Sequence, residues 1–454
     1  MAPDGSPLGL SRLMHFCHAA DAGLRQQFNI LEDGGRAAYM AWCLTGGFRH
    51  LGVDILTSGR NTPSLREPVT PAQKGHISPP DHAVALVGYA FGELGIGEDV
   101  RSMAAALRTA DVPFGILDFP KGLAARQQDY TAAADVADHS TAPVTCFCLT
   151  GFDTGRYLVE RGEARFRESY VVGYWPWELP HWPRPWSVAF ELVDEVWVSS
   201  RFTQDALQLV SPVPVIYMPM CVRLAPPVLF DRSTLGAILG NFLFLYVFDA
   251  NSYLERKNPA GVIAAFRRAF PTMTEPVGLV LKVMNAPPDS AAWEAVAEAA
   301  RQDPRIRIIA MTTTRAEVLG LIEACDAYVS LHRSEGFGRT IAEAMLLERP
   351  VVATGWSGSD ELITQDTALA VRSALIPVEP GAYPLADGTH WADPDLDHAA
   401  YCLRQTVQDS HGRAKRVAVA RSRVEERHSA AAVGARYRER LNLIGQIING
   451  KTAH

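Results

Sequence analysis

The stretch SEGFGRTIAEAM, residues 334–345, is the part of this chain that decides its fold. It lies between two short apolar runs, CDAYVSL at 325–331 and RPVVAT at 349–354, which predict buried strands. Glycines followed by helix-forming residues connect the two runs, so the predicted order is strand, loop, helix, strand. Open α/β sheets bind their ligands where the strands end, at the carboxyl edge. We therefore expect a ligand site in this loop.

Two carboxylates, Glu335 and Glu343, stand on either side of the expected helix start, which lies near Gly338 to Thr340. The free amides and the positive dipole end of a helix suit a phosphate at this point. Gly336 and Gly338 allow the backbone to come close to a ligand. The two carboxylates can accept hydrogen bonds from hydroxyls on either side of the phosphate. A nucleotide sugar has this order of groups: sugar hydroxyls, diphosphate, ribose hydroxyls.

The surrounding sequence, HRSEGFGRTIAEAMLLERPVVAT, resembles the E-x7-E signature of retaining glycosyltransferases of family 4. The resemblance implies an α/β fold of GT-B architecture, in which two Rossmann-like domains face a cleft. It implies that Glu335 contacts hydroxyls of the donor sugar and Glu343 holds the ribose, and neither is expected to be a general base. The same resemblance assigns donor binding to the loop and helix start, which are Gly336, Phe337, Gly338, Arg339 and Thr340. The alternative is a solvated helix with two ordinary glutamates.

Length and composition are those of a multidomain globular enzyme. The chain has 454 residues, of which 48% are apolar and 20% charged, and length alone suggests two or three domains. A formal net charge of -7 gives no reason to expect a nucleic-acid partner. Seven scattered cysteines are expected to be free thiols in a reducing cytosol. No signal peptide and no bilayer-spanning apolar run are recognised, so we expect a cytoplasmic protein, with peripheral contact at the inner face of the membrane left open.

Strand and helix patterns alternate in both halves of the chain, which predicts two parallel-sheet domains. We expect a helical N-terminal extension and linker at 1–81, with a proline-rich connection at 60–82. An N-terminal Rossmann-like, acceptor-side domain is expected at 82–230 and a C-terminal, donor-binding one at 231–395. By resemblance, the helices expected at 396–454 cross back to the first domain. Strands are predicted at 82–90, 112–119, 144–150, 170–174, 193–200, 213–220, from 242, 277–283 and 306–311, and helices at 97–110, from near 204, 259–270 and 316–324.

The segment FDANSYLERKNP, residues 248–259, follows an apolar strand and precedes a helix. Family 4 enzymes commonly carry a phosphate-binding arginine after this strand and a lysine five residues later. Lys257 fits the lysine position, and we predict a catalytic role for it in stabilising the leaving diphosphate. Ser252 stands at the arginine position, so this chain departs from the pattern, and Arg256 or alternatively Arg333 is the candidate to supply the missing charge. A basic pair at a solvated helix start is the alternative.

Two glycine-containing loops are expected at the same cleft. GELGIGED at 92–99 follows the first strand of the first domain, and its spacing differs from the dinucleotide fingerprint G-x-G-x-x-G. By analogy with GT-B enzymes, Gly95 and Gly97 are predicted to lie near the donor phosphate, and a tight turn with a helix cap is the alternative. The loop GWSGSDEL at 355–362 is expected at the cleft edge, with the equal alternative that Asp360 and Glu361 are ordinary helix-start acids. A nicotinamide-dependent dehydrogenase rests on the weak fingerprint alone and is rejected.

Four of the nine tryptophans fall within YWPWELPHWPRPW, residues 174–186. Its prolines exclude a regular helix through much of the segment. An aromatic loop near the cleft can stack on a sugar or contact a lipid-linked acceptor. We assign Trp177, Glu178 and His181 to the acceptor side, with Glu178 and His181 as candidates to orient a hydroxyl nucleophile. A proline-stiffened loop that packs on the first domain is an equal alternative.

The function that these features predict is retaining transfer of a hexosyl unit from a nucleotide sugar to an acceptor hydroxyl, in polysaccharide or glycoconjugate biosynthesis. The acceptor is expected to be a saccharide, a lipid-linked molecule or a small molecule. We recognise no Asp-x-Asp metal site at a strand end, so neither a metal nor another cofactor is expected. The alternatives are a GT-B phosphorylase, a nucleotide-sugar epimerase, or a noncatalytic nucleotide-sugar-binding protein. The donor base and sugar stay open.

Overall fold

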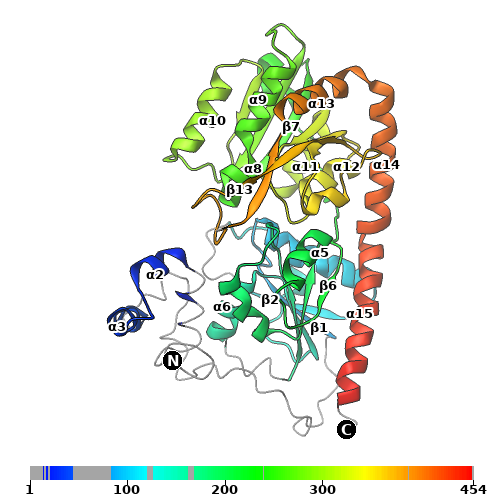
Figure 1. The fold of residues 1–454 in the computed structure, drawn as a ribbon. Helices are drawn as coiled ribbons and strands as arrows, with labels where there is room; N and C mark the ends of the chain where they lie inside the picture. The colour runs from blue at the N-terminus through cyan, green and yellow to red at the C-terminus, as the bar shows by residue number, and fades with distance from the viewer. Residues whose placement is uncertain are drawn as a thin grey trace.

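The chain forms two α/β domains, one above the other in Figure 1, with two long C-terminal helices running past both. The computed structural model describes residues 14, 17–18, 21–43, 83–119, 126–161, 168–238, 240–386 and 388–451. The predicted connection at 60–82 and most of the predicted N-terminal extension therefore lie outside the described residues.

The N-terminal domain is built on a six-stranded parallel sheet of order β2-β1-β3-β4-β5-β6. Its inner strands are continuous apolar runs because helices cover both faces of a parallel sheet. The strands are β1 (Val84–Gly88), β2 (Phe114–Asp118), β3 (Val144–Phe147), β4 (Tyr170–Tyr174), β5 (Glu195–Val198) and β6 (Val215–Tyr217). The helices are α5 (Gly95–Thr109), α6 (Gly151–Arg161) and α7 (Arg201–Gln208), with the 3-10 helices η3 (Ala133–Asp135) and η5 (Arg184–Leu192).

The C-terminal domain has a second six-stranded parallel sheet, of order β12-β11-β10-β7-β8-β9. Counted within the domain this is the Rossmann order 3-2-1-4-5-6. The strands are β7 (Phe242–Asp249), β8 (Val277–Met284), β9 (Ile306–Ile309), β10 (Ala327–Ser330), β11 (Val351–Thr354) and β12 (Leu369–Val371). The helices are α8 (Leu254–Lys257), α9 (Pro259–Ala269), α10 (Ala291–Arg301), α11 (Arg315–Ala324) and α12 (Arg339–Leu346), with the 3-10 helices η6 (Arg232–Ile238), η7 (Ala250–Ser252) and η8 (Gly358–Glu361).

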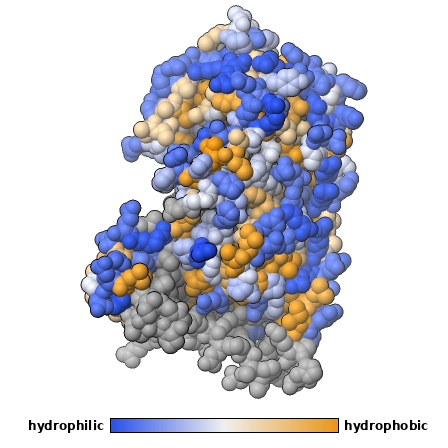
Figure 2. Space-filling view, viewed as in Figure 1, coloured by the Kyte–Doolittle hydropathy of each residue, from blue (hydrophilic) through white to orange (hydrophobic). Residues whose placement is uncertain are grey.

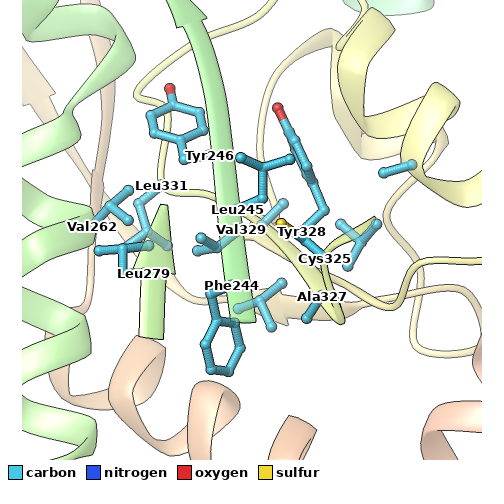
Figure 3. Packing of buried hydrophobic residues seen from close by; sticks show 14 of the residues in the cluster. Phe244, Leu245, Tyr246, Val262, Leu279, Cys325, Ala327, Tyr328, Val329 and Leu331 are labelled. Atoms are coloured by element: carbon cyan, nitrogen blue, oxygen red, sulfur yellow. The ribbon is translucent and has the colours of Figure 1, made fainter. Parts of the chain in front are cut away.

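The core of this second domain lies on both faces of its sheet. Figure 3 shows side chains of β7 and β10 packed with Val262 from α9 and Leu279 from β8. Strand β7 is apolar along nearly its whole length, so it is buried at the centre of the sheet. The expected fold class, two Rossmann-like α/β domains, is confirmed.

A two-stranded antiparallel hairpin, β13 (Ser373–Pro377) with β14 (His390–Pro394), follows the second sheet and was not predicted. Its connecting segment and β14 carry apolar side chains across to the first domain. Tyr383 and Trp391 belong to the same buried cluster as Trp177 of the tryptophan-rich loop. The hairpin therefore joins the two domains through apolar packing.

The C-terminal helices are α13 (Leu396–Gln408), α14 (Ser410–His428) and α15 (Ala430–Lys451). α15 returns to the first domain and packs along α5, on the right in Figure 1. Tyr437 stacks on Trp197 of β5 with 5.4 Å between ring centroids, and Arg440 forms an ion pair with Glu195 on the same strand. The described N-terminal helices are α2 (Ala22–Gln27) and α3 (Asp33–Trp42), which lie beside the first domain.

One helix boundary differs from the sequence prediction for a local reason. α7 begins at Arg201, not near Gln204, because the Ser200 side chain accepts a hydrogen bond from the Thr203 amide and caps the helix.

Polar side chains cover most of the face seen in Figure 2, with apolar patches between them. Among the described helices, none has both the length and the apolar character that a bilayer crossing requires.

Candidate active site

The site lies where the strand order of the second sheet reverses, between neighbouring strands β7 and β10. Connections from these two strands leave in opposite directions, and open α/β sheets bind their ligands at such a point, outside the carboxyl ends of the strands. The loop after β7 leads to Lys257, and the loop after β10 leads to Glu335. Asn258 ties the two loops together, because its side chain caps α9 at the Gly261 amide and donates to the Leu331 carbonyl at 2.9 Å.

Lys257 and Glu335, the two predicted catalytic residues, form a direct ion pair between Nζ and Oε1. The other carboxylate oxygen of Glu335 lies 3.5 Å from Nη1 of Arg256. Burial alone raises the pKa of Glu335, but the positive charges of Lys257 and Arg256 outweigh it and hold this pKa well below its ordinary value. Glu335 is therefore a carboxylate that accepts hydrogen bonds and has no proton to donate at neutral pH.

Arg256 is 1% exposed and fully engaged. It donates to the carbonyls of Ser252 at 3.1 Å and Ser334 at 2.7 Å, and its Nη2 lies 3.0 Å from Glu178 of the N-terminal domain. Burial lowers its pKa, but Glu178 and Glu335 more than offset this, so its pKa lies above the ordinary value. The guanidinium therefore connects the two domains and holds the loop that carries Glu335.

Arg333, the other candidate to replace an arginine at Ser252, turns away from this cluster. Its Nη2 donates to Asp393 at 3.1 Å, and its guanidinium lies over the Trp391 ring at 5.7 Å. Arg333 and Arg256 both have protein partners, so neither presents an unengaged cation in this structure.

The acceptor-side candidates lie in the loop after β4, directly over the double-glutamate loop. Glu178 accepts a hydrogen bond from Tyr383 at 2.7 Å, and its backbone carbonyl accepts one from the Ser334 hydroxyl. Trp177 is buried, and its Nε1 donates to the His181 carbonyl at 3.0 Å. The His181 ring is exposed, with Nδ1 3.3 Å from the Thr389 hydroxyl. Glu178 and His181 are therefore near the site surface, while Trp177 packs beneath them.

The loop and helix start at 336–340 fit tightly between the domains. A Cβ on Gly336 would stand 2.7 Å from the Trp177 carbonyl, and Gly338 adopts φ +90°, so glycine is required at both positions. Phe337 is buried against His428, with ring centroids 5.0 Å apart. The Thr340 hydroxyl accepts a hydrogen bond from Tyr328 at 2.8 Å, which fixes the first turn of α12.

The glycine loop of the first domain reaches the same place. Arg339 at the start of α12 forms an ion pair with Asp99 of α5, and its Nη1 lies 3.3 Å from the Ser102 hydroxyl. Gly95 is the first residue of α5, and a Cβ on Gly97 would stand 2.2 Å from the Gly92 carbonyl. The structure thus brings Gly95 and Gly97 to the side of the interface where α12 begins.

Glu343 lies one helical turn further along α12 and is fully buried. Its carboxylate forms an ion pair with Arg315, the first residue of α11. This pair lies within the second domain, whereas Arg256–Glu178 and Arg339–Asp99 bring loops of the two domains into direct contact.

His332 is a residue that the sequence reasoning did not single out. It is completely buried, with Nδ1 3.0 Å from the Ser330 hydroxyl and Nε2 2.8 Å from the Ser359 hydroxyl. Burial lowers its pKa to about 4, so the ring is neutral at physiological pH. It connects β10 to the 355–362 loop, in which Ser357 accepts a hydrogen bond from the Glu335 amide at 2.9 Å. A histidine two residues after a buried strand was the only signal for it in the sequence.

An Asp-x-Asp spacing does occur at a strand end, with Asp393 in the last part of β14 and Asp395 directly after it; it was not predicted because β14 was not predicted. Asp393 pairs with Arg333, and Asp395 caps α13. Within the described part of the chain, no group of three or more His, Cys, Asp or Glu side chains converges as metal ligands.

Comparison with known proteins agrees with this geometry. Residues 255–382 match the family model of glycosyl transferases group 1, a range that contains Lys257, Glu335 and Glu343. No curated protein sequence matches the chain.

Three solved structures are similar to the chain in fold. Sucrose-phosphate synthase from Thermosynechococcus elongatus is 15% identical, with a TM-score of 0.59 over 80% of this chain and 99% of that one. Anabaena HepE in complex with UDP-glucose is 16% identical, with a TM-score of 0.54 over 79% and 99%. Staphylococcus aureus TarM is 13% identical at a TM-score of 0.48, and the match covers 66% of this chain and 55% of TarM. The first two likenesses show the GT-B fold, and with the family match they support a GT-B glycosyltransferase.

Proposed function

We propose that this protein is a retaining glycosyltransferase that moves a hexosyl unit from a nucleotide sugar to an acceptor hydroxyl. The observation that carries the proposal is the Lys257–Glu335 pair at the strand-order reversal of the second sheet. In a nucleotide-sugar donor the diphosphate is joined directly to the sugar. Lys257 is a cation suited to the diphosphate, and the adjacent Glu335 is a hydrogen-bond acceptor suited to the sugar hydroxyls. The match of 255–382 to glycosyl transferases group 1 supports this assignment.

In this proposal the chain acts mainly by positioning and by electrostatics. Lys257 leaves Glu335 for the donor and neutralises charge that develops on the departing diphosphate. Glu335, an obligate carboxylate, accepts hydrogen bonds from hydroxyls of the donor sugar. The acceptor approaches on the face that the leaving group vacates, and a donor phosphate oxygen takes its proton. The two domains hold both substrates and exclude water, which limits hydrolysis of the donor.

The acceptor is proposed to enter over the loop after β4, where Glu178 and the exposed His181 ring lie. A saccharide or a lipid-linked saccharide fits this assignment, in a cytoplasmic protein that contacts the membrane only at its surface. Catalysis without a resident metal is proposed, because Lys257 and the start of α12 supply positive charge to the diphosphate. Anabaena HepE has been solved with UDP and glucose, which makes UDP-glucose one sensible donor to test first.

The test is a transfer and donor-hydrolysis screen with UDP, GDP and ADP sugars on the full chain. We expect turnover of one donor class, and the anomeric configuration of the product, read by NMR, should match that of the donor. Lys257→Met should lower kcat by about 10²- to 10³-fold, and Glu335→Gln should weaken turnover comparably. Lys415→Met, an exposed lysine on α14, is the matched control and should behave as wild type.

Other outcomes would identify the alternative functions. Consumption of inorganic phosphate with release of a sugar phosphate would indicate a phosphorylase. Interconversion of a nucleotide sugar without an acceptor would indicate an epimerase. Binding without turnover of any donor would indicate a nucleotide-sugar-binding protein. Failure to bind any nucleotide sugar would refute the proposal.

A further inference from the structure

Three helices begin at one point of the domain interface: α5 of the first domain and α11 and α12 of the second. Arg339, first in α12, pairs with Asp99 in the second turn of α5. Arg315, first in α11, pairs with Glu343 of α12. Burial raises the pKa of Glu98 of α5, but the nearby charges of Arg315 and other arginines outweigh burial and lower this pKa. Each helix start carries a partial positive charge on its free amides. The convergence therefore brings the backbone donors of three helix starts together, beside arginines that are paired with carboxylates.

Two of these helix starts lack a side-chain cap. Neither Leu94 before α5 nor Gly338 before α12 has a side chain that accepts a hydrogen bond from the first-turn amides. By contrast, Thr314 and Glu317 form a complete capping box on α11. Uncapped starts that face each other across two domains provide backbone donors for an anion.

Glu343 gives an independent indication that a ligand belongs here. Its side chain is completely buried; Oε1 is in contact with Nη2 of Arg315, and Oε2 accepts no hydrogen bond from any residue that the structure describes. Among the described residues, Arg315 is therefore the partner of one carboxylate oxygen, and the other oxygen has no hydrogen-bond donor. A buried carboxylate oxygen without a hydrogen bond is costly, so a hydroxyl donor from outside the chain would stabilise it.

The neighbouring arginines Arg101 and Arg339 are held by more protein partners than Arg315. Arg101 donates to the carbonyls of Ala90 at 3.0 Å and Gly92 at 2.9 Å, and it also contacts Glu98 and Asp129. These bonds make it part of the framework of the glycine loop. Arg339 is shared between Asp99 and the Ser102 hydroxyl. Arg315 has the fewest fixed contacts of these three guanidiniums.

The electrostatics of Arg315 favour an anion beside its guanidinium. Burial lowers its pKa to about 10, and the attraction of Glu98 does not offset burial together with the repulsion of Arg339, Arg101 and Arg223. A dianion at this point would relieve that repulsion. Arg256 and Arg333, the two residues first considered to replace an arginine at Ser252, are held elsewhere by their own partners.

We propose that Arg315 is a phosphate-binding residue that exchanges partners when the donor binds. In the empty protein Arg315 and Glu343 neutralise each other. When a nucleoside diphosphate binds, its phosphate oxygens pair with the Arg315 guanidinium, and its ribose hydroxyls donate hydrogen bonds to the released Glu343 carboxylate. Arg315 then supplies, from a different helix, the positive charge that is absent at Ser252. This inference rests on the proposed function, since it concerns the same donor site.

The test measures binding by calorimetry, with UDP, GDP, ADP, the matching nucleosides and inorganic pyrophosphate as probes. Arg315→Gln should weaken binding of the preferred nucleoside diphosphate by about 10- to 100-fold, the value of a hydrogen-bonded charge pair. Binding of the matching nucleoside should change by less than about threefold. Arg315→Lys should recover part of the diphosphate affinity. Arg301→Gln, an exposed arginine on α10 paired only within its own helix among the described residues, is the control.

Glu343→Gln provides the second, opposite measurement. It frees Arg315, so pyrophosphate should bind more tightly, while the nucleoside should bind more weakly. Equal losses of diphosphate and nucleoside affinity in Arg315→Gln would show a merely structural role and overturn the inference, as would an unchanged diphosphate affinity. If the wild-type protein binds a nucleoside diphosphate and Arg315 has no effect, only the inference fails. If the wild type binds none of the probes, the proposed function fails with it.

Discussion

Replacing Arg256 with methionine should reveal how strongly the two domains are joined at the site. Methionine keeps the length and much of the volume of the side chain but removes the charge and all five donors. Arg256 is 1% exposed and connects Glu178 of the first domain to Glu335 of the second. The substitution therefore removes a buried cross-domain ion pair and leaves the surrounding fold in place.

The magnitude follows from the partners that are lost. The carbonyls of Ser252 and Ser334 each lose a hydrogen bond from a charged donor, worth about 1.5–3 kcal/mol apiece. Glu335 keeps Lys257, and Glu178 keeps Tyr383 and is 27% exposed, so neither carboxylate is stranded. The two lost hydrogen bonds together amount to about 3–6 kcal/mol, and we expect about 4 kcal/mol here.

Urea unfolding, followed by tryptophan fluorescence, and a thermal melt provide the assay. For a domain of this size, about 4 kcal/mol corresponds to a fall in Tm of roughly 8–16 °C. Arg256→Lys should fall between wild type and Arg256→Met, because it keeps the charge without the planar fork. Arg301→Met, at an exposed position, should leave the midpoint unchanged. A change below about 1 kcal/mol in Arg256→Met would refute the assignment of a buried linking role.

Two further predictions concern the loops around the site. His332 has a pKa of about 4 in the folded chain and an ordinary value of 6.5, so between these values the unfolded chain binds more protons and acid lowers stability. His332 should thus lower the free energy of unfolding by up to about 3 kcal/mol as pH falls from 7 to 4, and His332→Gln should lack this loss. Urea titrations of both proteins measure it, and equal slopes of unfolding free energy against pH would contradict the prediction. Gly338→Ala should cost about 1–2 kcal/mol from its φ of +90°, and more because the new Cβ meets Ser359 at 3.0 Å. Gly381 has φ +83° and open space around it, so Gly381→Ala measures the cost of the backbone conformation alone. Equal losses of stability at Gly338 and Gly381 would show that the contact with Ser359 adds no cost.

Much of the fold was predictable because its signals are local. Parallel strands buried on both faces are short apolar runs, and the helices between them start at small or polar residues, so their order is visible in one sequence. The β4 strand was predicted with the bounds 170–174 that the structure has. The β13–β14 hairpin was missed because its strands are partly exposed and include proline and aspartate, which strand patterns disfavour.

Part of the candidate site was likewise predictable from local sequence, and part was not. The Lys257 and Glu335 loops follow strands that the sequence shows, and adjacency of β7 and β10 brings them together. The partners of Arg256 and Arg339 lie far away in the sequence, at Glu178 and Asp99, on the other domain. Nothing near either arginine in the chain indicates those contacts.

By itself the sequence therefore determined two α/β domains, the glutamate pair at 335 and 343, and Lys257 as its cationic neighbour. The tertiary structure decided which charges face each other: Arg256 with Glu178 and Glu335, and Arg315 with Glu343. The physical reason is that strand and helix preferences act over a few neighbouring residues. The pairing of buried charges depends instead on how distant segments pack within the second domain and on how the two domains are docked, which only the packed chain defines.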